Sequence, residues 1–138
     1  MRMAPAALIA LAHFGATQTT TVIVTVEGVE AEQGTINVGL CDKSLSREGC
    51  PYQAERPAVL GEVEVRFEKI PPGRYAVVSY HDLNENNEFD RLLGFPLEPY
   101  GLSNNAGESL APTFDQAALV IRDEETWIKI KLQRFLKR

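Results

Sequence analysis

Short runs in which apolar and polar residues alternate are the feature that most limits how this 138-residue chain can fold. In residues 62–67, Val63, Val65 and Phe67 alternate with charged residues. Because successive side chains of a β-strand point to opposite faces of the sheet, this spacing predicts a strand with one buried face. Similar runs are residues 20–27, 35–41, 74–81, 117–121 and 126–132. None shows the period of an amphipathic helix, so the sequence predicts an all-β fold.

The order of these runs indicates which strands are neighbours. Residues 20–27 and 35–41 are separated by a short acidic turn, so we expect them to pair as in a hairpin. Residues 117–121 and 126–132 form a second expected pair. Apolar residues on both faces of 74–81 predict a central, covered strand. The pattern as a whole favours an antiparallel β-sandwich of roughly seven strands in two packed sheets.

Residues 82–116 interrupt this pattern, because they show no sustained periodicity. The stretch is rich in Gly, Pro and Asn, yet it also carries large apolar residues, among them Leu92, Phe95 and Phe114. A disordered linker lacks such residues, and unstructured loops of this length are uncommon inside a compact domain. We therefore expect a long ordered excursion that lies over one edge of the sandwich. A local interaction is needed to hold it there.

The charge balance narrows the classes of partner. The chain has 19 acidic and 14 basic residues, with a formal net charge of −5. Nucleic acids and anionic membranes require a basic surface, so neither is expected as the main partner. The length suits one domain with its own core.

The N-terminus is typical of an export signal. Arg2 supplies a positive charge, and residues 3–14 are apolar and rich in Ala and Leu. This apolar stretch is too short to span a bilayer. We expect residues 1–17 to be a signal peptide and residues 18–138 to form a single β-sandwich domain in the periplasm or outside the cell. The alternative is that the apolar stretch is a buried first strand or helix.

The two cysteines agree with export. Cys41 and Cys50 are expected to form a disulfide in an oxidising compartment, closing a small polar loop. Their spacing matches neither a zinc knuckle nor a redox C-x-x-C pair.

Oxygen-bearing side chains recur at every second position after residue 81. This spacing matches the first nine positions of a calcium-binding loop. Ca²⁺ takes six to eight oxygen ligands at short distance, and a tight loop of this kind supplies several of them from one segment. The predicted ligands are Asp82, Asn84, Asn86, Glu88 through its carbonyl, and Asp90. The same pattern is also compatible with a loop that is rich in Asx turns and binds nothing.

Two positions depart from the usual calcium loop. Asn87 stands where a glycine normally makes the sharp turn, although Asn tolerates left-handed geometry better than most residues. Leu93 stands where a bidentate acid is expected, so that ligand comes from elsewhere, with Glu98 and Asp115 as candidates.

Other polar and aromatic residues around the excursion are candidates for binding a ligand. They are His81, Tyr80, Tyr100, Ser103, Asn104 and Asn105. Such side chains can orient a small molecule, or can satisfy the backbone of a folded loop. His81 with Ser79, or with a carboxylate of the excursion, is the basis for a catalytic alternative. No nucleophile elbow, phosphate-binding loop or paired-carboxylate framework accompanies them, so we assign no catalytic residue.

Several of these segments together resemble a bacterial family of small exported proteins that is known only as a domain of unknown function. The segments are Pro71-Pro72-Gly73-Arg74-Tyr75-Ala76, His81-Asp82-x-Asn84-x-Asn86, Gly94-x-Pro96, Tyr100-Gly101-x-Ser103-Asn104-Asn105-Ala106 and Pro112-x-Phe114. The family is similar in pattern to transthyretin-like and carboxypeptidase-regulatory-like domains. The resemblance implies an immunoglobulin-like (prealbumin-like) sandwich in the periplasm or envelope, and it implies no activity.

The sequence thus favours an exported, non-catalytic binding or accessory module. Its calcium-stabilised loop is expected to shape a surface for a small ligand or an envelope protein. Two alternatives stay open, which are a hydrolase or isomerase that uses His81, and a purely structural envelope protein.

Overall fold

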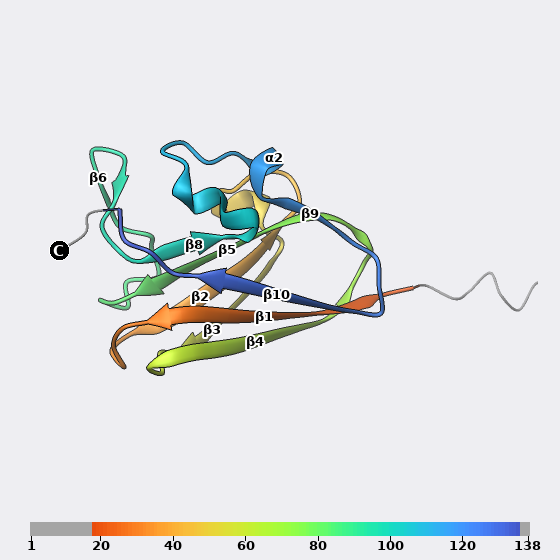
Figure 1. Ribbon diagram of the computed structural model, residues 1–138, viewed down its shortest axis with the longest axis horizontal. Coiled ribbons are helices and arrows are strands. Elements are labelled where there is room, and N and C mark those ends of the chain that lie inside the picture. The colour runs from red at the N-terminus through yellow and green to blue at the C-terminus, as the bar shows by residue number, and fades with distance from the viewer. Residues whose placement is uncertain (1–17, 136–138) are drawn as a thin grey trace, which may run out of the picture.

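Two β-sheets pack face to face in the computed structural model, which describes residues 18–135 (Figure 1). The smaller sheet has the order β10-β1-β4, with bounds Glu125–Lys131, Thr20–Val29 and Gly61–Ile70. The larger sheet has the order β3-β2-β5-β8, and β9 also pairs with β5. Its strands are Tyr52–Pro57, Thr35–Cys41, Gly73–Asp82, Tyr100–Leu102 and, for β9, Ala118–Ile121. The predicted all-β sandwich is confirmed.

The main core lies between the two sheets and follows the predicted alternation. The apolar residues of β1, Val22, Val24 and Val26, are completely buried there. The alternating apolar residues of β2 and β4 join them in one cluster; they are Ile36, Val38, Leu40, Val63, Val65 and Phe67. One face of each strand is therefore excluded from water, as the period of two requires.

The expected strand pairs are wrong, although the strands themselves exist. β1 does not pair with β2; it pairs in parallel with β10 and antiparallel with β4. β2 lies in the other sheet between β3 and β5. Likewise, β9 and β10 are not partners, because β9 pairs with β5. The chain changes sheet at these turns, and alternation says which face of a strand is buried but not which strand lies beside it.

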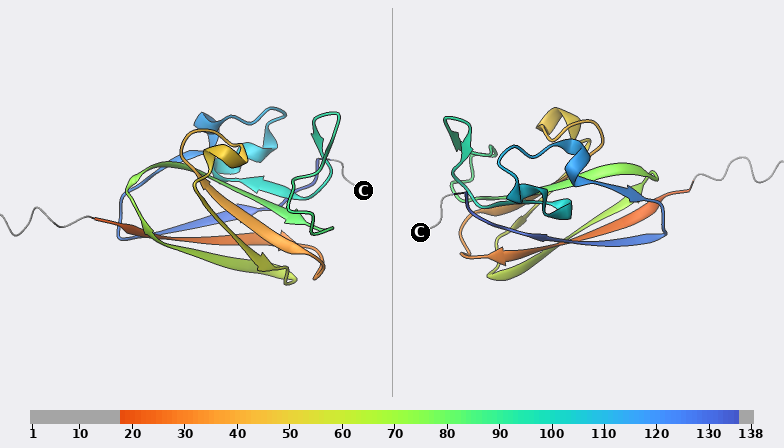
Figure 2. Two further views of the ribbon diagram at one scale, coloured as in Figure 1. Left: turned by 180° about the vertical axis from the view of Figure 1, so that it is seen from behind. Right: turned by 45° about the horizontal axis from the view of Figure 1, so that its top comes forward.

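The excursion, residues 82–116, forms several short elements. These are β6 (Arg91–Leu92), β7 (Phe95–Pro96), β8, the 3₁₀ helix η2 (Ser103–Glu108) and the start of α2 (Phe114–Ala117). β8 is the edge strand of the larger sheet beside β5, and the other elements lie over the outer face of that sheet, away from the smaller sheet (Figures 1 and 2). A second apolar cluster fills the space beneath them, and it includes Ala76 of β5 with Ala106 and Ala117.

The predicted disulfide between Cys41 and Cys50 is present. Both cysteines belong to the second apolar cluster, so the bond holds residues 42–49 on the outer face of the larger sheet. The segment includes the 3₁₀ helix η1 (Arg47–Gly49), and the Asp42 N–H donates to the Gly49 carbonyl at 2.9 Å. β3 follows directly, in a segment that lacked a strand pattern.

The predicted signal peptide, residues 1–17, lies outside the described residues. Within residues 18–135, no helix has the length and apolar character needed to cross a bilayer.

Candidate functional site

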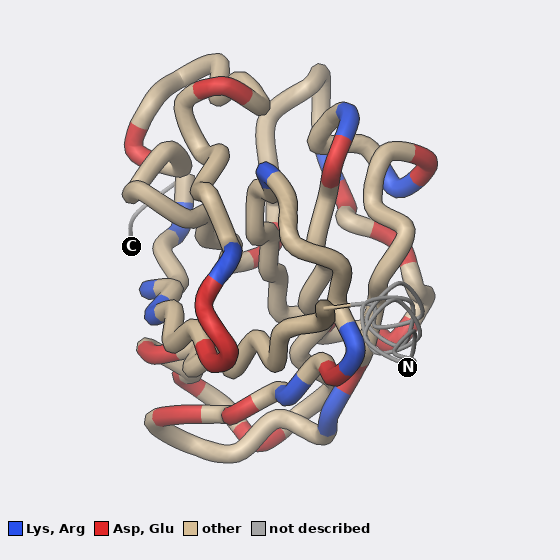
Figure 3. The backbone as a smooth tube through the Cα atoms, turned by 90° about the vertical axis from the view of Figure 1, so that its right-hand side faces the viewer, with Lys and Arg blue, Asp and Glu red and all other residues tan. Residues whose placement is uncertain are grey.

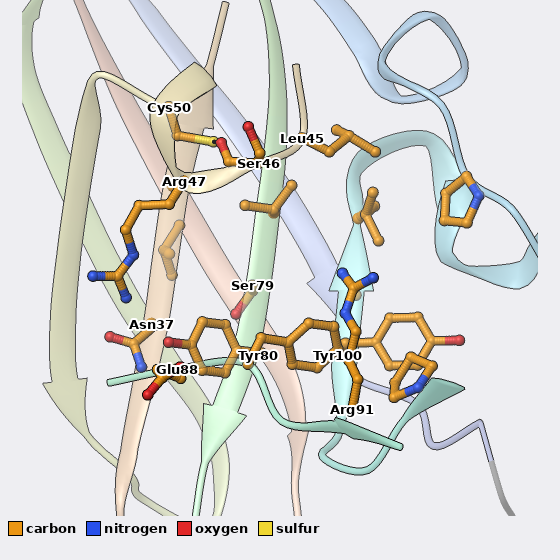
Figure 4. A pocket seen from close by; sticks show the side chains of 18 of the residues that line it. Asn37, Leu45, Ser46, Arg47, Cys50, Ser79, Tyr80, Glu88, Arg91 and Tyr100 are labelled. Atoms are coloured by element: carbon orange, nitrogen blue, oxygen red, sulfur yellow. Dashed lines mark hydrogen bonds between the residues drawn. The ribbon is translucent and has the colours of Figure 1, made fainter. Parts of the chain in front are cut away.

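A groove of about 1060 Å³ lies on the outer face of the larger sheet (Figure 4). β2 and β5 form its floor, which includes Asn37 and Tyr80. The disulfide-closed segment forms one wall, with Leu45 and Arg47. Residues 87–91 and 109–112 border the rest of the groove. The two segments that the sequence marks as unusual, the disulfide segment and the oxygen-rich loop, therefore meet at one cavity.

The sheet register brings two polar groups together on the floor. Asn37 of β2 lies directly opposite Tyr80 of β5, and directly paired residues project from the same face of a sheet. The Asn37 amide nitrogen is buried and has no hydrogen-bond partner among the described residues. Burial, followed by the nearby Asp82 carboxylate, raises the pKa of the Tyr80 hydroxyl, so that this hydroxyl stays neutral. The floor thus holds one buried donor without a partner among the described residues and one neutral hydroxyl.

An aromatic cluster pins the end of the oxygen-rich loop onto the sheet. The Phe89 ring lies between two tyrosines, with centroid distances of 5.2 Å to Tyr80 and 5.8 Å to Tyr100. The Arg91 guanidinium carbon lies 5.0 Å from the centroid of the Phe89 ring. The two tyrosines predicted to bind a ligand are thus partly covered by Phe89. Packing of Phe89 against these two tyrosines holds the end of the oxygen-rich loop on the larger sheet.

Two arginines and three glutamates border the groove. Arg47 donates a hydrogen bond to the Asn87 carbonyl and so links the disulfide segment to the oxygen-rich loop. Within residues 18–135, no carboxylate oxygen lies within 4.0 Å of the guanidinium of Arg47 or Arg91. Acidic and basic residues are otherwise spread around the molecule (Figure 3). Each of the two guanidinium groups therefore lacks a carboxylate partner among the described residues, although the lining as a whole carries more acidic than basic side chains.

Asp82 organises the first half of the oxygen-rich loop. It is completely buried, and its two carboxylate oxygens accept from the backbone N–H groups of Asn86 at 3.3 Å and Asn87 at 2.8 Å. Asn87 has φ 61°, the left-handed geometry expected at the position where calcium loops have glycine. The carboxylate thus closes the sharp turn of the loop.

Asp90 forms hydrogen bonds with two other predicted ligands. Its two oxygens accept from the side-chain amides of Asn84 at 2.9 Å and Asn86 at 2.8 Å. Three of the five predicted ligands therefore converge at hydrogen-bond distance. An amide carries its oxygen and nitrogen on the same carbon, so rotation of these two amides would direct oxygens to the same point. Glu88 is predicted to bind through its backbone carbonyl, and its side chain is exposed and borders the groove.

Glu98 is the second buried carboxylate of this region. One oxygen accepts from the Leu83 N–H and the other from the Asp90 N–H, each at 3.0 Å, so Glu98 joins the two ends of the loop. Burial is the largest effect on this carboxyl and raises its pKa, while the two N–H bonds act in the opposite direction. The other candidate for the missing ligand, Asp115, pairs with Arg74 at 3.1 Å on another part of the molecule.

No group of three or more His, Cys, Asp or Glu side chains within residues 18–135 is arranged to hold a metal ion. The oxygens at the loop come from two carboxylates, two amides and the backbone. Such a set carries little negative charge, and among divalent ions it suits Ca²⁺ better than Zn²⁺, which prefers nitrogen and sulfur.

His81 lies on the inner face of β5 and is not a groove residue. Its ring is buried, and Nε2 donates to the Gln33 carbonyl at 2.6 Å. Nδ1 is buried without a partner among the described residues, and the Ser79 hydroxyl is likewise unpartnered. The histidine therefore contacts a backbone carbonyl rather than a nucleophile or a carboxylate.

The three polar residues 103–105 lie at η2 and do not border the groove. The buried Ser103 hydroxyl donates to the Ala117 carbonyl at 2.5 Å and accepts from the Val77 N–H at 2.9 Å. The Asn104 amide donates to the carbonyls of Gln116 at 3.2 Å and Ala118 at 3.1 Å. Asn104 and Asn105 both adopt positive φ. Ser103 and Asn104 connect η2 to β5 and α2.

Three residues that define the groove were not singled out from the sequence, namely Asn37, Arg47 and Arg91. Asn37 occupies an outward position of a strand, where a polar residue is ordinary. Arg47 and Arg91 belong to segments far apart in the chain, and only the fold brings them to one cavity. Their sequence neighbourhoods carry no signal for this arrangement.

Comparison with known proteins places the whole sandwich in one family. A family model described as "Uncharacterized protein conserved in bacteria (DUF2141)" matches residues 24–129, which run from β1 into β10 and include every segment that borders the groove except Phe135. No curated protein and no solved structure matches the chain.

Proposed function

The chain belongs to this uncharacterized bacterial family, and we propose that it is an exported, non-catalytic binding module with a calcium-stabilised loop beside its ligand groove. The observation that carries the proposal is the groove itself. A cavity of about 1060 Å³ is within or slightly above the range of small-molecule sites. It combines an aromatic floor with a few converging polar groups, which is the usual composition of such sites.

The position of the oxygen-rich loop supports a calcium role. Asp82, Asn84, Asn86, Asp90 and the Glu88 carbonyl are the residues that would hold the ion. Residues 87–89 border the groove directly, so an ion that orders the loop would also order this wall. With only two carboxylates among its ligands, the site is expected to bind Ca²⁺ with a Kd on the order of 10⁻⁴ to 10⁻³ M, as in extracellular modules.

The surroundings of His81 support a non-catalytic module. A general base must lie within hydrogen-bond reach of the proton that it removes. The His81 ring is buried on the core side of β5, whereas the groove lies on the other side. The hydrolase or isomerase alternative would require a polar side chain bonded to this ring, and no such bond exists among the described residues.

The turn before β5 supports the likeness to transthyretin-like domains. The Tyr75 hydroxyl donates to the Pro71 carbonyl at 2.7 Å, so the tyrosine of the Pro-Pro-Gly-x-Tyr segment closes its own turn. Export to the periplasm or beyond rests on the N-terminal sequence and on the disulfide. It is tested by fractionating cells that produce the full chain with a C-terminal tag, where a cytoplasmic location would contradict it.

Thermal unfolding in excess Ca²⁺ and in chelator tests the metal loop. An ion that binds only the folded state at a hundred times its Kd adds about 2.7 kcal/mol to the free energy of unfolding. We expect Ca²⁺ at about 10–100 mM, a hundred times the Kd given above, to raise the Tm of the wild type and not that of Asp90→Asn. Asp123→Asn, in an exposed turn, is the matched control and should respond like the wild type.

Two results would contradict the calcium role. The first is a wild-type Tm that is equal in Ca²⁺ at that concentration and in chelator. The second is an equal shift in Asp90→Asn and in the wild type, which would place the ion elsewhere. A loop without calcium beside a groove that binds nothing would favour the structural envelope protein.

A further inference from the structure

We propose that the groove takes a small amphipathic anion, with a carboxylate or phosphate headgroup on an apolar body, and that Arg47 and Arg91 supply the charge that holds the headgroup. This inference rests on the binding function proposed above and names the chemical class of its ligand.

Several hydrogen-bond donors border the groove without an anionic partner among the described residues. Arg47 and Arg91 are not ion-paired within the described residues, and each guanidinium carries five N–H donors in a planar fork. The buried Asn37 amide nitrogen also has no partner there. Figure 4 shows the two guanidinium groups on either side of the Tyr80 ring. Donors from three separate elements therefore border one cavity, and a ligand oxyanion would supply an acceptor for them.

The apolar part of the groove calls for a hydrocarbon body on the same ligand. Leu45, Val78 and Leu102 border the cavity as partly buried side chains of the second apolar cluster. Leu110, also at the groove, is 84% exposed. Covering these surfaces stabilises a complex because it removes apolar area from water. A bare inorganic anion would leave this area uncovered, whereas an amphipathic anion covers it.

The acidic residues near the groove limit the charge of the ligand. Glu48, Glu55 and Glu88 border it with exposed side chains, as Arg47 and Arg91 do, so water screens charges of both signs and direct contact with a guanidinium must hold the headgroup. The three glutamates disfavour ligands with several negative charges. The structure thus points to a ligand with one anionic headgroup.

Four probes with the same hydrocarbon chain and different headgroups test the inference. They are octanoate, octyl phosphate, octylamine and octanol, each titrated calorimetrically into the full-length, disulfide-bonded protein. We expect octanoate or octyl phosphate to bind at least tenfold more tightly than octylamine or octanol, and the tighter of the two anions identifies the headgroup. Amide NMR shifts of Gly39 and Tyr80 should report binding at the groove.

Charge-removing variants locate the headgroup. Arg47→Gln and Arg91→Gln should each raise the Kd of the preferred anion about tenfold more than they raise the Kd of octanol. Arg122→Gln removes an exposed arginine that does not border the groove and should leave every affinity unchanged. Added salt should weaken the anion and not octanol.

The possible failures separate this inference from the proposed binding function. Octylamine or octanol binding at the groove as tightly as the anions would overturn the anionic class and retain a binding module. Equal anion affinity in wild type, Arg47→Gln and Arg91→Gln would overturn the role of the arginines. Absence of binding by all four probes would overturn the amphipathic ligand, and the calcium titration would then decide the remaining proposal by itself.

Discussion

The two faces of β5 differ in what they contact and in what they can do. On the inner face, Tyr75 and Val77 belong to the main core, and His81 is buried at the end of the same row. On the outer face, Ala76 and Val78 meet the covering segments, and Tyr80 lies at the floor of the groove. The inner face is closed by a whole sheet, whereas the outer face is covered by short elements that leave a cavity.

This difference explains why His81, the candidate general base, does not lie at the groove. Residues 80 and 81 are adjacent, so their side chains point to opposite sides of the sheet. His81 is held in the interior by a bond to a backbone carbonyl, and Tyr80 faces the cavity. A face packed by regular strands favours stability, and a face covered by loops provides room for a ligand.

The largest effect is expected on the inner face. Ile36 is fully buried in the main core beside His81, so Ile36→Ala should lower the free energy of unfolding by about 2–5 kcal/mol, measured by urea denaturation. Val120→Ala, at a position 66% exposed, is the control and should change it by about 0.5 kcal/mol or less. Under native conditions, Ile36→Ala should keep the wild-type octanoate affinity. A weakened affinity would mean that the two faces are coupled.

A smaller loss of stability, with a clear effect on the groove, is expected from removing the disulfide. Replacing both Cys41 and Cys50 by Ala should cost about 2.5–3 kcal/mol in the chain-entropy model for a loop of this size. It should also weaken octanoate binding, because the bond holds the segment that carries Arg47. Reduction of the wild type should reproduce both effects. Unchanged octanoate affinity in the reduced protein would show that the groove wall does not depend on the bond.

The smallest effect concerns pH dependence at the loop. The pKa of Glu98 is raised by burial, so the folded state holds its proton more strongly than the unfolded state. The contribution of Glu98 to stability should therefore fall as the pH rises through the interval between its ordinary pKa and the raised value. The difference in unfolding free energy between wild type and Glu98→Gln should fall with rising pH across this interval.

The Glu98→Gln variant also loses an acceptor for one of the two backbone N–H groups, at a cost of about 1–3 kcal/mol that is independent of pH. The prediction is therefore tested by how the difference in unfolding free energy between the two proteins changes with pH, and not by the size of that difference at one pH. A difference that rises with pH would show that the two N–H bonds outweigh burial. Urea denaturation in chelator between pH 4 and pH 7 would measure it, roughly spanning the usual range of a buried Glu.

Local chemistry was predicted correctly where it depends on neighbours in sequence. The strand positions follow from alternation, and β2 runs over the predicted residues 35–41. The cysteine pairing and the left-handed Asn87 were also predicted. The strand β3 was missed, because it is an edge strand with few apolar residues and lacks a clear inward face.

The arrangement of the strands and the groove was decided only in three dimensions. Alternation with a period of two shows which face of a strand is apolar. Because every strand in a sandwich has this same period, alternation does not show which strands are neighbours. The parallel pairing of β1 with β10 therefore has no sequence signal of its own. For the same reason, the sequence alone identified the oxygen-rich loop and the disulfide segment, but not that Arg47 reaches the loop or that Phe89 packs between two tyrosines. Those contacts join residues distant in the chain, and packing of the covering segments on the larger sheet determines them.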